Sequence, residues 1–260
     1  MNDKKVAVIT GAGQGIGLAA AYKFAEEGWA IALIDLNKDT VEKETKILQE
    51  QGADAAFYIL DVSDFEKGRE VVQQIRQRFG RIDALFNNAG ITGHRLDVLH
   101  CDPQEIKRAT DVNLFSSLYM TQHVAKVMVA EKIKGAIVNV SSISAELASW
   151  DPFGYQISKY GVKGLTKSTA FQLGAYNIRV NAVAPGTTRT PMSEMDWSNP
   201  EICKMWESKN VLHKWLEPEE IANAAYFLAS DAASGITGAI LMADAGYTIT
   251  KADNRENIYE

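Results

Sequence analysis

The sequence predicts an α/β fold of the doubly wound type, in which a central parallel sheet of about seven strands is flanked by helices on both faces. Three observations support this prediction. Short β-branched runs alternate with amphipathic stretches from end to end, which indicates βαβ units. A glycine-rich turn follows the first apolar run directly. The 260 residues suit one large α/β domain with ample material for a core.

The first half of the chain opens with an apolar run that the glycines cut short, so we interpret it as a strand rather than a signal peptide. A helix then begins where the glycine turn ends, and a second strand leads into a highly charged helical stretch. The predicted order is strand 5–10, helix 16–27, strand 30–35, helix 40–51, strand 55–60 and helix 65–79.

The second half continues the alternation with one short strand and one long helical pattern. The predicted order is strand 84–87, helix 104–132, strand 136–140, helix 155–175, strand 178–184, helix 218–228 and strand 239–243. Right-handed crossovers between these parallel strands give a Rossmann-type fold. We expect a single catalytic domain over 1–250, with a substrate lid over about 188–215, and a charged C-terminal tail over 251–260.

Composition excludes several functional classes. The net charge of −6 counts against a nucleic-acid partner and an anionic membrane surface, and no apolar run approaches the ~20 residues of a membrane span. Cys101 and Cys203 lie far apart without Cys-x-x-Cys spacing, which indicates neither disulfides nor zinc. The four histidines show no ligand pattern, so we expect no metal and place them on the surface or in loops. A cytoplasmic, reducing compartment follows.

The glycine-rich turn predicts a phosphate-binding site. Gly11 permits the tight turn, Gly15 lets the backbone approach a pyrophosphate, and Gly17 lets the helix pack close to the sheet. The N-terminus of the following helix offers free N–H groups and the positive end of its dipole to a phosphate. The alternative is a structural glycine loop that binds no ligand.

The carboxylate of Asp35 ends the second predicted strand, at a suitable distance after the glycines. It can accept hydrogen bonds from the adenosine ribose hydroxyls and would repel a 2′-phosphate, which favours NAD over NADP. Lys38 is the one nearby cation that opposes this preference. Taken alone, Asp35 is better explained as a turn residue before Asn37.

Tyr155 and Lys159 are four residues apart, so on a helix they share one face. An ammonium beside the phenol would lower the tyrosine pKa from its ordinary value of about 10 and prepare it for proton exchange with a substrate oxygen. Ser142 follows the predicted strand 136–140, at the sheet edge where ligands bind. The alternative is a surface pair without chemistry.

These motifs together resemble the short-chain dehydrogenase/reductase family along nearly the whole chain. The residues that carry the resemblance, in family order, are Thr10-Gly11-x3-Gly15-x-Gly17, Asn87-Asn88-Ala89-Gly90, Asn113, Ser142, Tyr155-x3-Lys159 and Pro185-Gly186. Gly246 follows Ala245 where the family often has Asp-Gly-Gly, a small departure that affects only the local loop.

The resemblance implies a catalytic role for four of these residues. Tyr155 would be the general acid/base, and Lys159 would lower its pKa and bind the nicotinamide ribose. Ser142, chosen over Ser141 by its spacing to Tyr155, would hold the substrate oxygen. Asn113 would hold a water that links Lys159 to solvent.

The resemblance also implies a set of cofactor contacts. The segment 87–90 would line the adenosine and ribose, Asp61-Val62 would cap the adenine, and the residues after strand 178–184 would meet the nicotinamide and pyrophosphate. The full predicted set is Gly11, Gln14, Gly15, Ile16, Gly17, Asp35, Leu36, Asp61, Val62, Asn88, Ala89, Gly90, Tyr155, Lys159, Pro185, Gly186, Thr188 and Thr190.

The substrate site is less well defined by the sequence. Its predicted residues are Ser142, Ser144, Trp150 and Tyr155. Glu146 and His94 could bind hydroxyls, which favours a polyol or sugar, or could simply face solvent. The methionines and tryptophans of the lid either exclude water from the reaction or pack as core or subunit contacts.

We therefore expect an NAD-dependent oxidoreductase acting on a secondary alcohol or its ketone, with polyols and sugars among the candidate substrates, as a homotetramer or homodimer. One alternative is a 3-oxoacyl-(acyl-carrier-protein) reductase, but the negative net charge and Asp35 argue against it. Another is an NAD-binding sensor without catalysis, but the presence of all four predicted catalytic residues argues against it.

Overall fold

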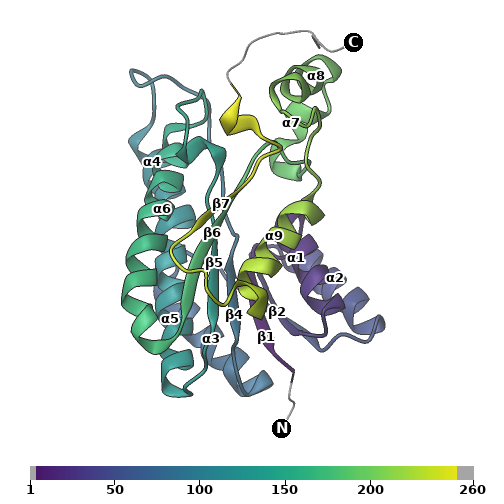
Figure 1. Ribbon diagram of the computed structural model, residues 1–260, viewed down its shortest axis with the longest axis vertical. Coiled ribbons are helices and arrows are strands. Elements are labelled where there is room, and N and C mark those ends of the chain that lie inside the picture. Colours follow the sequence, from purple (N-terminus) through teal and green to yellow (C-terminus); the bar gives the residue numbers. More distant parts are fainter. Residues whose placement is uncertain (1–3, 251–260) are drawn as a thin grey trace.

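The computed structural model describes residues 4–250, and the predicted tail 251–260 lies outside them. Seven parallel strands form one sheet in the order β3-β2-β1-β4-β5-β6-β7 (Figure 1). The strands are β1 Val6–Thr10, β2 Ala30–Asp35, β3 Ala55–Ile59, β4 Ala84–Asn87, β5 Ala136–Val140, β6 Arg179–Pro185 and β7 Ile240–Ala243. The predicted fold class, a Rossmann-type parallel sheet between helices, is confirmed.

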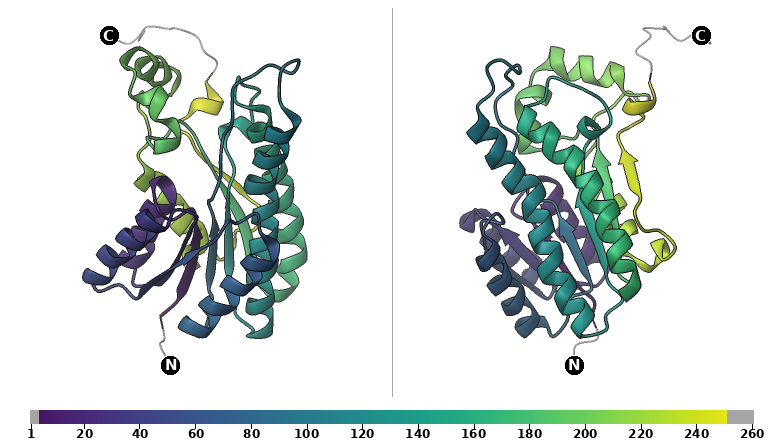
Figure 2. Two further views of the ribbon diagram at one scale, coloured as in Figure 1. Left: turned by 180° about the vertical axis from the view of Figure 1, so that it is seen from behind. Right: turned by 90° about the vertical axis from the view of Figure 1, so that its left-hand side faces the viewer.

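Helices cover both faces of this sheet. They are α1 Gly15–Glu26, α2 Lys38–Glu50, α3 Phe65–Phe79, α4 Pro103–Thr110, α5 Ser116–Ala130, α6 Phe153–Leu173, α7 Glu194–Trp197, α8 Pro200–Lys209 and α9 Pro218–Ala229. Figure 2 shows α1, α2 and α9 on one face and the long helices α5 and α6 on the other. The short helices α7 and α8 lie beyond the carboxyl ends of the strands.

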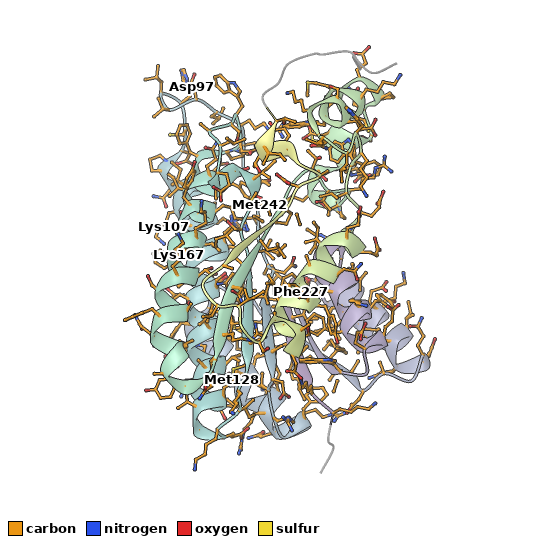
Figure 3. All side chains as sticks on the ribbon, viewed as in Figure 1. Asp97, Lys107, Met128, Lys167, Phe227 and Met242 are labelled. Atoms are coloured by element: carbon orange, nitrogen blue, oxygen red, sulfur yellow. The ribbon has the colours of Figure 1, made fainter. Side chains whose placement is uncertain are left out.

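The strand order reverses at β1, which positions the site. Ile9 pairs with Leu33 of β2 on one side and with Phe86 of β4 on the other. Crossovers therefore run in opposite directions from β1, and the loops after β1 and β4 diverge at the carboxyl edge of the sheet. This is the switch point at which ligands bind in open α/β sheets. In Figure 3, Asp97 lies at that end of the molecule and Met128 at the opposite end.

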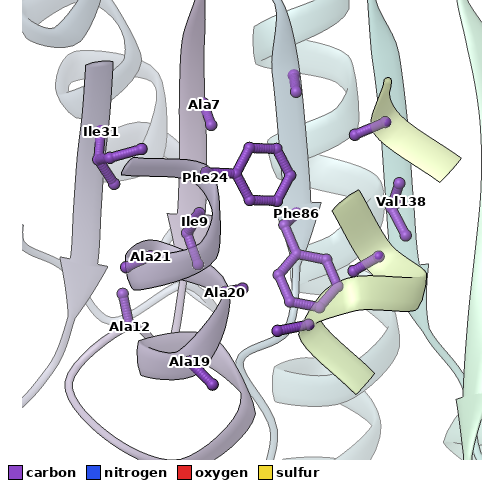
Figure 4. Packing of buried hydrophobic residues seen from close by; sticks show 14 of the residues in the cluster. Ala7, Ile9, Ala12, Ala19, Ala20, Ala21, Phe24, Ile31, Phe86 and Val138 are labelled. Atoms are coloured by element: carbon purple, nitrogen blue, oxygen red, sulfur yellow. The ribbon is translucent and has the colours of Figure 1, made fainter. Parts of the chain in front are cut away.

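The strands are apolar throughout because both faces of the sheet are buried. Phe24 of α1 and Phe86 of β4 are almost completely buried and pack over Ile9 in the core on the α1 face (Figure 4). Val6 and Val8 point to the opposite face and join the core beneath α3 and α5. The alternation of neighbouring residues between two cores fixes the register of each strand.

The helical pattern predicted over 104–132 is not one regular helix. A π-helical turn, Asp111–Phe115, joins α4 to α5, and the Ser116 N–H donates to the Asp111 carbonyl. Such a turn adds a residue to the helix and is frequent at functional sites. Placing His123 on the surface was also wrong, because its ring is buried in α5 and Nε2 lies 3.0 Å from the Phe65 carbonyl oxygen.

Candidate active site

The glycine turn requires its glycines for close packing. Gly11 has φ +64°, and a Cβ there would lie 2.9 Å from the Ala89 Cα. A Cβ at Gly17 would lie 2.1 Å from the Gly11 carbonyl oxygen, far inside contact distance. The turn after β1 is thus pressed against both α1 and the loop after β4, as the sequence predicts for Gly17.

Hydrogen bonds tie the loop after β4 to this turn. The Asn88 side-chain amide donates to the carbonyls of Thr10 and Gly11 at 3.0 and 3.1 Å. The Thr10 hydroxyl oxygen accepts from the backbone N–H groups of Asn88 and Ala89. The predicted cofactor residues of these two loops therefore form one rigid surface at the switch point.

Asp35 lies beside the glycine turn, at the end of β2. Its carboxylate accepts from the Gly13 N–H at 2.8 Å and from the Asn37 N–H at 2.9 Å. Leu36 is mostly exposed next to it. Asp35 is thus the turn residue of the alternative interpretation, and its carboxylate is also held against the glycine turn, as the predicted contact with an adenosine ribose requires.

The last residues of the predicted cofactor set, in segment 185–190, are also placed by the fold, and Thr190 lies at the same turn. A Cβ at Gly15 would lie 3.5 Å from the Thr190 Cβ, although the two residues are far apart in sequence. Gly186 lies against Asp244, where a Cβ would come within 2.7 Å of the Asp244 Cα. The chain after β6 therefore returns over the N-terminus of α1. The Gly11–Gly17 turn with Asp35 and Thr190 fits a dinucleotide, because glycines line it and a helix N-terminus opens into it.

The predicted acid/base pair meets at the carboxyl end of β5. Burial raises the pKa of Tyr155 to about 12, and the Ser142 hydroxyl beside the phenol lowers this pKa by a smaller amount. The neighbouring Ser141 turns away and donates to the Lys159 carbonyl at 3.3 Å, so the structure places Ser142 rather than Ser141 beside the phenol.

Lys159 lies under the tyrosine and is almost fully buried. Its Nζ donates to the Val140 carbonyl at 2.8 Å and lies 5.4 Å from the centre of the Tyr155 ring. Burial lowers the pKa of Lys159 to about 8. The predicted lowering of the Tyr155 pKa by this ammonium is not what the structure shows, because Nζ points to the β5 carbonyl and desolvation of the phenol dominates.

Asn113 sits in the π-helical turn and fixes the loop after β4. Its Oδ1 accepts from the Ile91 N–H at 2.8 Å, and its amide donates to the Ile91 carbonyl at 2.9 Å and to the Ser158 hydroxyl at 3.0 Å. Ser158 immediately precedes Lys159 in α6. Asn113 therefore connects the loop after β4 to the helix that carries the predicted acid/base pair.

Asp151 is a site residue that the sequence reasoning missed. Its Oδ2 accepts from the hydroxyls of Ser144 and Ser149 at 2.5 and 2.7 Å, and Ser142 donates to the Ser144 hydroxyl at 3.1 Å. The sequence did contain a signal for this residue, namely a carboxylate that lies four residues before Tyr155 and shortly after a Ser-x-Ser run. The predicted contact Trp150 is 81% exposed beside it.

The two side chains proposed to bind hydroxyls are engaged elsewhere. Glu146 pairs with Lys163 at 2.7 Å, and His94 Nδ1 lies 2.5 Å from Glu105 Oε1. Among residues 4–250, His, Cys, Asp and Glu side chains do not gather in a group of three that could hold a metal ion. The same range contains no helix that is long and apolar enough to cross a membrane.

The predicted lid segment contains both exposed and buried apolar side chains. Met192 and Met195 are exposed near the start of the segment, while Trp215 is buried and donates to the Cys203 carbonyl. Arg95, from the loop after β4, donates to Asp196 of α7 at 2.9 Å and joins the lid to the other side of the site.

Comparison with known proteins supports an oxidoreductase. A family model described as enoyl-(acyl carrier protein) reductase matches residues 11–248. The chain is 38% identical over 246 residues to a Thermotoga maritima 3-oxoacyl-(acyl-carrier-protein) reductase, covering 94% of this chain and 98% of that one. It is 39% identical over 247 residues to a 3alpha-hydroxysteroid dehydrogenase of Mediterraneibacter gnavus, covering 94% and 97%. A gluconate 5-dehydrogenase from Burkholderia cenocepacia, solved in complex with NADP and tartrate, has a TM-score of 0.90 at 31% identity over 95% and 96% of the two chains.

Proposed function

The chain belongs to the short-chain dehydrogenase/reductase family, and on that premise we propose that it is an NAD-dependent dehydrogenase of a secondary alcohol, with a polyol or sugar as substrate class. The observation that carries the proposal is the convergence of Ser142 and Tyr155 at the carboxyl end of β5, with the buried Lys159 Nζ 5.4 Å from the centre of the tyrosine ring. These groups can hold one substrate oxygen and exchange its proton.

The chain's own residues supply orientation and proton handling, and the nicotinamide supplies hydride exchange. The Tyr155 oxygen takes the proton of the substrate alcohol, or returns one to the ketone oxygen in the reverse direction. The Ser142 hydroxyl fixes that oxygen by a hydrogen bond. Lys159, rigid on the β5 carbonyl, places a positive charge beneath the phenol and would bind the nicotinamide ribose.

The preference for NAD rests on Asp35. Its carboxylate lies 2.8 Å from the Gly13 N–H, close to the turn that would hold the pyrophosphate, and a 2′-phosphate there would meet a negative charge. The Burkholderia relative was solved with NADP, so the cofactor requires direct measurement. The remaining cofactor residues would be those of the glycine turn, segment 88–90 and segment 185–190.

The lid and the assembly follow from exposed apolar side chains. We place the segment 188–215 over the substrate, with Met192 and Met195 as its exposed apolar residues. Phe115 on the π-helical turn and Tyr160 and Phe171 on α6 are also exposed, which supports a homotetramer or homodimer. The expected compartment is the cytoplasm.

The test is steady-state turnover with each cofactor. Purified protein is assayed by NADH absorbance against polyols, neutral sugars, hydroxy acids and simple secondary alcohols, with NAD and NADP compared for each. We expect turnover with NAD, and kcat/KM at least about tenfold higher than with NADP. Binding of NADH without turnover of any alcohol or ketone would instead indicate a sensor.

A second candidate is 3-oxoacyl-(acyl-carrier-protein) reductase, favoured by the 38% identity to the Thermotoga enzyme. Its substrate is carried by an acidic protein, which calls for a basic docking surface, and the chain has a net charge of −6. Reduction of an acetoacetyl thioester with NADPH at a higher kcat/KM than any alcohol oxidation would establish this alternative.

A further inference from the structure

A chain of hydroxyl groups leads from the predicted acid/base tyrosine to a carboxylate. The Asp151 carboxylate can only accept hydrogen bonds, so the Ser144 hydroxyl, 2.5 Å away, must donate to it. The Ser142 hydroxyl lies 3.1 Å from the Ser144 oxygen. Asp151 is therefore held next to the serine pair that leads to Tyr155.

The position of Asp151 is not explained by helix capping. A carboxylate just before a helix ordinarily accepts from the first free N–H groups. Here Pro152 is the N-cap of α6, no side chain caps it, and the Asp151 carboxylate accepts from Ser144 and Ser149 instead. The Gln156 side chain donates to the Asp151 carbonyl at 3.1 Å and holds the loop in place.

The charge of Asp151 reaches the edges of the site. Burial is the main cause of the raised pKa values of Tyr155 and Tyr247, and the Asp196 hydrogen bond is the main cause of the raised pKa of Arg95; the charge of Asp151 adds a smaller contribution to all three. These residues come from α6, the C-terminal segment and the loop after β4. The Arg95 guanidinium hydrogen-bonds Asp196 at 2.9 Å, so Asp196 already balances its charge. Lys159 faces the Val140 carbonyl beneath the tyrosine. Asp151 thus adds one negative charge to the substrate side.

We propose that Asp151 determines substrate specificity by accepting a hydrogen bond from a hydroxyl of an uncharged polyol or sugar and by disfavouring substrates that carry a carboxylate. Both serine hydroxyls bind Oδ2, and within residues 4–250 no hydrogen bond reaches Oδ1. That oxygen is the acceptor offered to substrate. The proposal rests on the proposed function, because it concerns the same site.

With Asp151 in this role, the site selects substrates by their charge as well as by the number of their hydroxyl groups. A hydrogen bond to a charged acceptor contributes enough for about a ten- to hundredfold discrimination. A substrate carboxylate near Asp151 would meet like charge in a partly buried setting, where screening by water is weak. Neutral polyols are therefore favoured over sugar acids of the same length.

The test compares wild type, Asp151→Asn and the control Asp231→Asn. The control removes the same charge from an exposed residue that pairs with Lys5, remote from the site. The probes are sorbitol and L-rhamnose as neutral polyhydroxy substrates, gluconate as a sugar acid and cyclohexanol as a single-hydroxyl alcohol. We expect Asp151→Asn to lower kcat/KM for the neutral probes about ten- to hundredfold, mainly through KM, to raise it for gluconate and to leave cyclohexanol within about threefold.

Several outcomes would overturn the proposal. Equal loss on cyclohexanol would show a general structural role, and unchanged turnover of neutral polyols would show that Asp151 does not contact substrate. If wild type oxidises cyclohexanol or gluconate but no neutral probe, this specificity is wrong while the proposed activity, NAD-dependent oxidation of a secondary alcohol, stands. If wild type binds NADH yet turns over nothing, both fail. Should Asp151→Asn not fold, as judged by its melting temperature, Asp151→Ala is compared in the same assays.

Discussion

Lys159 and Tyr155 lie one helical turn apart in α6, with the lysine Nζ 5.4 Å from the centre of the tyrosine ring. Burial shifts both groups toward their neutral forms, because it raises the pKa of Tyr155 to about 12 and lowers that of Lys159 to about 8. At neutral pH the protein alone therefore holds a protonated phenol above a protonated amine. Such a pair is ready to give a proton to a ketone oxygen.

Replacing Tyr155 with Phe should remove the proton path and keep the shape of the ring. General acid/base catalysis contributes roughly 10²–10⁴-fold, so we expect kcat to fall by about three orders of magnitude. NADH binding, measured by fluorescence, should change less than about threefold. Turnover within tenfold of wild type would contradict the assignment of Tyr155.

The pH dependence should differ between the two directions. Alcohol oxidation needs the phenolate of Tyr155, and a pKa of about 12 makes that form scarce at neutral pH. Its kcat/KM should rise with pH from 6 to 10, while kcat/KM for ketone reduction stays flat or falls. Ser142→Ala should move the rise to higher pH, because the Ser142 hydroxyl lowers the tyrosine pKa. A rise at lower pH in this variant would contradict the hydrogen bond.

Lys159 should make stability depend on pH. Its pKa is about 8 in the folded chain and near 10.4 when unfolded. Between these values the unfolded chain binds the extra proton, so the free energy of unfolding rises with pH, by up to about 3 kcal/mol. Wild type should therefore gain stability relative to Lys159→Met from pH 8 to 10 in thermal melts. A constant difference would show that the amine is not desolvated.

The local pattern of the sequence predicted the sheet. A strand that is buried on both faces is an uninterrupted apolar run, and such a run can be recognised without knowing which strands it pairs with. The sequence predicted Ser142, Tyr155 and Lys159 because short spacings place them on one strand end and one helix face. It could not predict the π-helical turn at Asn113, which Ile91 and Ser158 hold from distant segments. Asp151 was missed for a related reason, since only the folded loop turns its carboxylate toward Ser144.

The two side chains considered for hydroxyl binding show the same limit. Glu146 and His94 were chosen by chemical type, and each has a partner that sequence proximity did not suggest. Lys163, on α6, neutralises Glu146, and Glu105 binds the His94 ring. Ionisable side chains in loops pair with whatever the fold brings near, so their type alone does not assign them to a substrate.

Asp35 should control the choice of cofactor. Asp35→Ala removes the carboxylate that would repel a 2′-phosphate, and leaves the Gly13 N–H without its 2.8 Å acceptor. We expect kcat/KM with NAD to fall and that with NADP to rise, changing their ratio by about a hundredfold or more. Asp39→Ala, an exposed carboxylate in the first turn of α2, is the matched control. An unchanged ratio would assign Asp35 to the turn alone.

Gly17 should be intolerant of any side chain. A Cβ there would lie 2.1 Å from the Gly11 carbonyl oxygen and 2.5 Å from the Asn88 amide nitrogen, so the turn after β1 would have to move. We expect Gly17→Ala to lower the melting temperature and to weaken NADH binding more than tenfold. Gly164→Ala is the control, because a Cβ at that exposed position of α6 meets nothing within 4 Å. That substitution should stabilise the helix by about 0.5–1 kcal/mol, since alanine loses less backbone entropy than glycine on folding. Equal effects at the two positions would mean that the glycine turn is not packed as closely as the structure shows.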